Sequence, residues 1–126
     1  MSEMELYYVN KKRKKVEVFL TNHAIEAFRD RWKKVYPEDH LEESNLRAKL
    51  VSRFKSSHRV KNLSKQEKER IRKHGPTLFF RQNSFTFVVA DCRIVTVEIS
   101  DKYKRYLNKD ERAIQSRRNI LGKQVR

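Results

Sequence analysis

The chain has 126 residues, and its 31 lysines and arginines outnumber its 16 aspartates and glutamates, so the formal net charge is +15. This length suits one domain with one hydrophobic core. No apolar run reaches membrane-spanning length, which excludes a transmembrane helix, and we expect no secretory signal because no apolar stretch follows the first lysines. Cys92 is the sole cysteine, so we expect no internal disulfide and a reducing, cytoplasmic location.

The positive charge indicates a nucleic-acid partner. The isoelectric point near 10.2 exceeds the value of about 9 that is typical of nucleic-acid-binding domains. Anionic membranes are the competing partner, but they favour a basic helix with exposed large apolar residues, and the sequence has none. We therefore expect no membrane partner.

The charge is divided unevenly along the chain. Residues 1–15, 51–76 and 101–126 carry net charges of +3, +7 and +6, whereas residues 16–50 and 77–100 carry −1 and 0. This division indicates that the two nearly neutral segments build the core and that three basic segments lie around it.

The first predicted element is a β-hairpin. Residues 5–10 and 16–21 are rich in β-branched and aromatic side chains, and the run KKRKK between them forms a basic tip. Thr21 or Asn22 then caps a helix that ends at Pro37. The buried face of this helix is predicted from apolar residues at helical spacing, namely Ile25, Phe28, Trp32, Val35 and Tyr36.

Two further helices are predicted. Residues 39–42 have the spacing of a capping box, and so do residues 64–67, which open a short polar helix. Gly75 stands where a glycine commonly ends a helix. The helix after the first box has one apolar face, made of Leu46, Leu50, Val51 and Phe54.

Three strands follow, over residues 77–82, 84–90 and 93–100, with turns at residue 83 and at residues 91–92, so they form an antiparallel meander. In the last strand, alternation of side chains predicts two faces. The core face holds Val95, Val97 and Ile99, and the other face holds Ile94, Thr96 and Glu98. We expect Thr96 and Glu98 to point away from the core or into a cleft.

Together these elements predict an α+β fold, in which an N-terminal β-hairpin and two to three helices pack on a three- to four-stranded antiparallel sheet. We expect residues 1–100 to form a single compact domain with a basic hairpin. We expect residues 101–126 to form a basic, sparsely apolar tail that is either helical over residues 109–121 or partly disordered.

Metal chemistry is not indicated by the sequence. None of the four histidines lies four residues from another, and no carboxylate cluster has the spacing of a two-metal nuclease. RNA needs no metal for cleavage, because its 2′-hydroxyl attacks the adjacent phosphate when side chains transfer protons and cations stabilise the added charge. Histidine, arginine and lysine suffice for this, so we expect no metal, no cofactor, and RNA rather than DNA.

His23 is the best candidate for proton transfer. It lies nearly opposite the apolar stripe of its helix, and a helix N-terminus favours a bound phosphate. Arg29 and Arg31 flank the stripe, and Arg31 with Arg81 would stabilise the phosphorane. The alternative is that His23 is a surface residue of the first turn and that the arginines are solvated.

Phosphate contacts are expected from the basic segments, although a charge run is also the usual mark of a solvated face. The strand phenylalanines are expected in the core rather than stacked on bases. The candidate nucleic-acid contacts are Lys11, Lys12, Arg13, Lys14, Lys15, Arg29, His58, Arg59, Lys65, Lys68, Arg72, Lys73, His74, Lys102, Lys104 and Arg105.

The order of motifs, a strand entering T-x-HA-x-x-x-x-R-x-R, then helices, then FVVADCRIVTVEI, resembles the barnase–EndoU–colicin–RelE superfamily of toxin-like ribonucleases. It is most similar to the small uncharacterised bacterial branch with an HA…R…R helix. The resemblance covers about residues 16–100 and implies metal-independent RNA cleavage or RNA binding, with an antitoxin-like inhibitor as a candidate partner. His23 and Arg31 match the helix signature, and Thr96 falls on the last core strand. The usual arginine four residues after the histidine is Ala27 here, which bears on catalysis more than on fold.

The leading hypothesis is therefore an RNA-directed protein, a toxin-like endoribonuclease that needs no metal. The alternative is a non-catalytic nucleic-acid-binding module, such as a phage or nucleoid factor. A protein that mimics DNA is disfavoured by the positive charge. Catalysis requires a histidine, an arginine and a strand residue around one phosphate, whereas binding requires only a broad basic surface.

Overall fold

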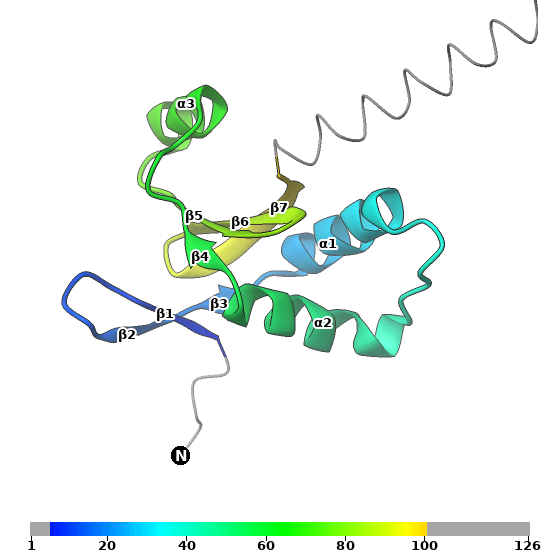
Figure 1. Ribbon diagram of the computed structural model, residues 1–126. Coiled ribbons are helices and arrows are strands. Elements are labelled where there is room, and N and C mark those ends of the chain that lie inside the picture. Colours follow the sequence, from blue (N-terminus) through cyan, green and yellow to red (C-terminus); the bar gives the residue numbers. More distant parts are fainter. Residues whose placement is uncertain (1–5, 101–126) are drawn as a thin grey trace, which may run out of the picture.

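The computed structural model describes residues 6–100, so the predicted tail helix and the candidate contacts Lys102, Lys104 and Arg105 lie outside the described residues. No helix in this range is long and apolar enough to cross a membrane. The helices are α1 (Asn22–Val35), α2 (Glu43–Lys55) and α3 (Lys65–His74) (Figure 1). The strands are β1 (Tyr7–Val9), β2 (Lys15–Glu17), β3 (Phe19–Leu20), β4 (His58–Arg59), β5 (Leu78–Gln82), β6 (Phe85–Ala90) and β7 (Arg93–Ile99).

The strands form two sheets, and the predicted α+β class is confirmed. β1 and β2 pair antiparallel as the predicted hairpin, and the main sheet has the strand order β3-β7-β6-β5-β4. β5, β6 and β7 are the predicted meander, β4 extends it antiparallel, and β3 pairs with β7 in parallel. β3 and β4 have 2 residues each, too few to show a period, and they widen the sheet to five strands.

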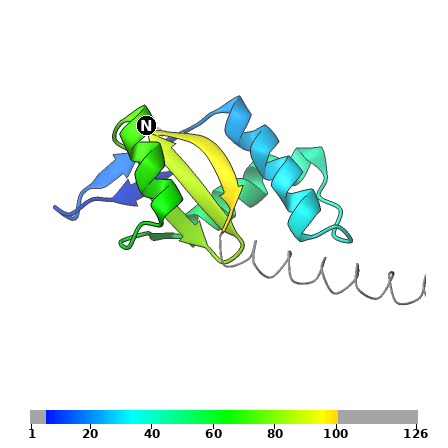
Figure 2. The same ribbon diagram turned by 90° about the horizontal axis from the view of Figure 1, so that it is seen from above.

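Helices cover both faces of the main sheet. α1 and α2 pack on one face and α3 lies over the other, so the sheet is the middle layer (Figures 1 and 2). In the core, the ring of Phe28 lies 5.2 Å from Phe85 and 5.8 Å from Trp32. From α2, Phe54 lies 5.5 Å from Phe87. These contacts confirm the apolar faces predicted for the first two helices.

A β-bulge changes which residues of β7 face the core. Val89 pairs with Ile94 but Val88 pairs with Thr96, so Val95 is an extra residue between the two pairs. Ile94 therefore turns into the core, where it is fully buried. The prediction that Val95 faces the core and Ile94 faces away was wrong, because it assumed strict alternation of side chains, and an inserted residue interrupts that alternation.

Beyond the bulge, the predicted alternation holds. Val97 and Ile99 belong to the core cluster between the sheet and the first two helices. Glu98 lies on the opposite face, where it lines a pocket beside α3, and Thr96 shares that face because it lies two residues before Glu98.

The start of α1 is tied to the sheet by its cap. The hydroxyl of Thr21 accepts a hydrogen bond from the N–H of Ala24 (3.1 Å) and donates one to the carbonyl of Ile94 (2.7 Å). One side chain therefore closes the helix N-terminus and fixes it to β7.

The other two helices start differently from each other. α3 begins with the predicted capping box, because the Ser64 hydroxyl accepts from the N–H of Glu67 and the Glu67 carboxylate accepts from the N–H of Ser64. α2 begins at Glu43 with no side-chain cap, so the box predicted over residues 39–42 was wrong. The carbonyl of Asp39 instead accepts a hydrogen bond from the Trp32 indole (2.8 Å), which keeps this segment in the loop.

Replacing Phe28 with alanine should lower the free energy of unfolding by about 3–5 kcal/mol, because the side chain is fully buried and its loss leaves a cavity. Urea unfolding followed by tryptophan fluorescence measures this change. Phe19→Ala is the control: Phe19 is 56% exposed, so the loss should stay below about 1 kcal/mol. Equal losses in the two variants would contradict the assigned core.

Candidate nucleic-acid interface

The basic tip of the hairpin is held in a defined shape by Asn10. Its side-chain oxygen accepts hydrogen bonds from the backbone N–H groups of Lys12 (2.9 Å) and Lys14 (3.0 Å). Arg13 has a left-handed φ of 60°, and its N–H donates to the carbonyl of Asn10 (3.0 Å). All residues of the run 11–15 are exposed. The tip thus presents its cations to solvent from an ordered turn.

A second basic segment lies at the edge of the main sheet. β4 pairs with β5 only, so its other edge has no neighbouring strand within residues 6–100. His58 and Arg59 of β4 are exposed, and the exposed Lys61 follows. A groove of about 560 Å³ separates this segment from the hairpin, with Lys11 on the hairpin side and Arg59 and Lys61 on the other.

α3 is fixed to the sheet by polar contacts through Glu67. One carboxylate oxygen accepts from the N–H of Ser64 (2.8 Å), and the other accepts from the guanidinium of Arg81 (3.0 Å). Arg81 also donates to the hydroxyl of Thr86 (3.3 Å), which lies 3.2 Å from the hydroxyl of Ser100. Because Glu67 is buried, its charge is tolerated only with such partners. These contacts therefore determine where α3 lies.

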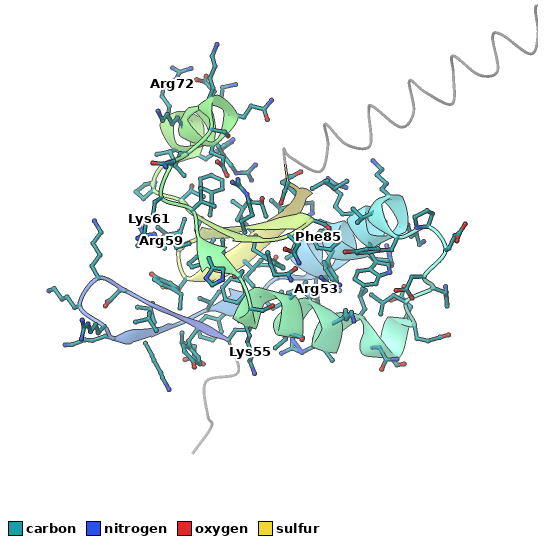
Figure 3. All side chains as sticks on the ribbon, in the orientation of Figure 1. Arg53, Lys55, Arg59, Lys61, Arg72 and Phe85 are labelled. Carbon is teal, nitrogen blue, oxygen red and sulfur yellow. The ribbon has the colours of Figure 1, made fainter. Side chains whose placement is uncertain are left out.

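The outer side of α3 is cationic. Arg72 points away from the sheet (Figure 3) and is paired with Glu69. The hydrogen bond from Arg72 to this carboxylate raises the pKa of Arg72 above its ordinary value. The exposed residues of α3 that were predicted to contact nucleic acid are Lys65, Lys68, Arg72, Lys73 and His74.

These three basic parts lie at one end of the molecule. The hairpin, β4 and α3 share one end in both ribbon views, and α1 lies at the other (Figures 1 and 2). Arg59 and Lys61 lie between the hairpin and α3 (Figure 3). We call this surface the basic end. It comprises the run 11–15, the segment 58–61 and the exposed cations of α3.

Arg29, another predicted contact, lies apart from the basic end. It belongs to α1, donates a hydrogen bond to Glu43 (3.3 Å) and lies 3.7 Å from the carboxylate of Asp30. The hydrogen bond to Glu43 raises the pKa of Arg29 above its ordinary value. Two carboxylates therefore compensate the charge of this arginine.

The four residues predicted for catalysis do not meet at one point. His23 is exposed in the first turn of α1, and within residues 6–100 no hydrogen bond or ion pair engages its side chain. Arg31 lies eight residues later, roughly 12 Å further along the helix axis, and its guanidinium is 3.8 Å from the carboxylate of Glu98. Arg81 is bound to α3, and Thr96 is buried.

Two of these candidates, Arg81 and Arg31, approach one pocket. Arg81 and Glu98 line a pocket of about 200 Å³ between α3 and the sheet, together with Arg70 of α3. Arg31 reaches the same pocket through its contact with Glu98. His23 is not among the lining residues, so the pocket brings carboxylates and guanidinium groups together without the predicted histidine.

Comparison with known proteins gave no match. No family model, no curated protein and no solved structure matches the chain. The resemblance of the His23 helix to toxin-like ribonucleases is therefore still a hypothesis that rests on its short motif.

Three residues that shape the basic end were not assigned this role from the sequence. Asn10 stands between a strand and a charged run, a usual place for a turn-forming asparagine, and this signal was available. Lys61 follows Arg59 within the most basic segment and carried the same signal as its neighbours. Glu67 was predicted to cap α3, but its contact with Arg81, 14 residues away, has no local signal.

Replacing Glu67 with alanine should release α3 from the sheet and loosen its first turn, because the change removes the carboxylate from both Arg81 and the N–H of Ser64. We expect a loss of about 2–3 kcal/mol in unfolding free energy, and amide exchange over residues 65–74 should become faster. Glu69→Ala is the matched control: it removes the same charge from the same helix, but its exposed pair with Arg72 contributes less than about 1 kcal/mol. Equal exchange rates in both variants would show that other contacts hold α3.

Proposed function

We propose that this protein binds RNA through the basic end. The observation that supports this proposal is the gathering of three basic parts, far apart in the sequence, on one side of the fold. The tip lysines, Arg59 and Lys61 are exposed, whereas Arg29 is paired with carboxylates. Exposed lysines and arginines are the groups that neutralise phosphates and release counterions.

The choice of RNA follows from the resemblance of the His23 helix to toxin-like ribonucleases. The same resemblance implies an antitoxin-like inhibitor as a protein partner, and we include this partner in the proposal. A cytoplasmic location is also part of the proposal, since the exposed Cys92 thiol would stay reduced there.

Replacing Lys11 and Lys12 with serine should weaken binding to a generic RNA and flatten its salt dependence. The slope of log K against log salt should fall by about 1.4–1.8, because each phosphate contact contributes about 0.7–0.9. Fluorescence anisotropy at several salt concentrations measures the slope.

The matched control is replacement of Lys33 and Lys34 with serine. These two lysines are also adjacent and exposed, but they lie in the last turn of α1, away from the basic end. Their loss should leave the slope nearly unchanged. Equal slopes for the two double variants would show that the tip does not contact phosphate.

Cleavage of the bound RNA without a metal is a second candidate function. It is favoured by the pocket that Arg81 and Glu98 share and that Arg31 reaches through Glu98. There the Glu98 carboxylate accepts the proton of a 2′-hydroxyl, the 2′ oxygen bonds to phosphorus, and the bond from phosphorus to the 5′ oxygen breaks. Water protonates the leaving 5′ oxygen, and the arginines stabilise the charge on the phosphorus-bound oxygens. His23 could serve only a site at the start of α1.

Cleavage should survive EDTA and leave 2′,3′-cyclic phosphate ends, because the 2′-hydroxyl is the nucleophile. Glu98→Gln should lower its rate by about 10²–10⁴, the usual contribution of a proton-transfer group, while His23→Ala should change the rate little. Gel analysis of end-labelled RNA measures both. The reverse order of effects would place the reaction at the start of α1, and no cleavage by the unaltered protein would leave binding as the function.

A further inference from the structure

The groove between the hairpin and the β4 segment differs from the rest of the basic end because apolar side chains form part of its lining, and we call this part its floor. Val9 of β1 lines it and is 55% exposed, one of two large apolar side chains that stand out in this way within residues 6–100. Leu63 and Leu78 line the groove with it. Removing apolar surface from water is favourable. Contact between this floor and the apolar faces of a partner would therefore stabilise the complex.

The rim of the groove is cationic and uncompensated. Lys11 lies on the hairpin side of the groove. Arg59 and Lys61 lie on the β4 side (Figure 3). Among the described residues that line the groove, none is acidic. Across residues 6–100, no ion pair or hydrogen bond engages the side chains of these three cations. The rim thus suits a ligand that carries several negative charges.

A ligand of this groove must combine negative charges with flat apolar faces. An RNA strand with unpaired bases has both, since its phosphates alternate with exposed base faces. A duplex keeps its base faces stacked inside and shows mainly phosphates and sugars to a protein, so it would leave the floor uncovered. The volume of about 560 Å³ lies within the range of roughly 300–1,000 Å³ for sites that enclose a small ligand, which suits a short stretch of one strand.

We propose that this groove binds a single-stranded segment of RNA. The sugar–phosphate backbone follows Lys11, Arg59 and Lys61, and base faces rest on Val9 and Leu63. The inference rests on the proposed function and adds that unpaired RNA is bound in preference to duplex. Because aliphatic side chains contact base faces without hydrogen bonds, the groove accepts any base.

The first test compares the affinity of the whole protein for a short labelled oligouridylate with that for a blunt RNA duplex of equal length. We expect the single strand to bind at least about tenfold more tightly at the same salt, a difference of about 1.4 kcal/mol. Duplex binding that is equal or tighter overturns the inference and leaves RNA binding by the basic end intact. Failure to bind either RNA overturns the proposed function as well.

The second test uses two variants that alter the groove. Val9→Thr keeps the shape and the β-branched side chain but makes the floor polar, and it should weaken oligouridylate binding about fivefold. Lys61→Gln removes one rim cation and should lower the salt slope by about 0.7, the value of one contact to a single strand.

Each variant has a matched control outside the groove. Phe19→Thr makes the other exposed apolar side chain polar; Phe19 lies on β3, at the opposite edge of the main sheet from β4. Lys33→Gln removes an exposed lysine of α1. Neither control should change oligouridylate binding. If Val9→Thr and Lys61→Gln bind oligouridylate as the controls do, the groove has another occupant and the inference falls.

Discussion

The pairing of the Glu67 carboxylate with Arg81 is the contact on which the position of α3 on the main sheet depends. α3 has one large apolar residue, Ile71, and it is only half-buried, so hydrophobic burial holds the helix weakly. Glu67 uses one oxygen to close the helix N-terminus and the other to reach β5. One side chain therefore decides both where α3 begins and where it lies, and the positions of the α3 cations follow from it.

The parts of the fold that could be predicted are those whose signal is local. Helical spacing marked Phe28 and Trp32, and residues 64–67 marked the start of α3, because each pattern involves neighbours in the chain. The bulge at Val95 and the two-residue strand β4 could not be predicted, because each depends on a pairing with another strand. The predicted start of α2 was wrong because the indole of Trp32, a residue of α1, holds the backbone of Asp39, which was expected to cap α2.

The same distinction, between local signals and contacts that join distant elements, applies to the candidate site. Composition identified the cations but not their neighbours: Arg29 and Arg59 look alike in the sequence, yet Glu43 compensates only the first. The separation of His23 from Arg31 follows from helix geometry and was readable from their spacing. The contact between Arg31 and Glu98 could not be predicted from the sequence, because it joins the first helix to the last strand of the described chain. A basic surface is thus easier to predict than a site that several elements assemble.

The hydrogen bond from Thr21 to Ile94 spans 73 residues, and this separation has a consequence during synthesis. α1 has no sheet to pack on until β7 has been made, roughly 4–15 s later at elongation rates of about 5–20 residues per second. During that interval Phe28 and Trp32 lack the sheet residue Phe85, whose ring packs against both of them in the folded protein. The ribosome thus synthesises the apolar face of α1 long before the sheet residues on which it packs. This makes α1 the segment where a holding chaperone would act.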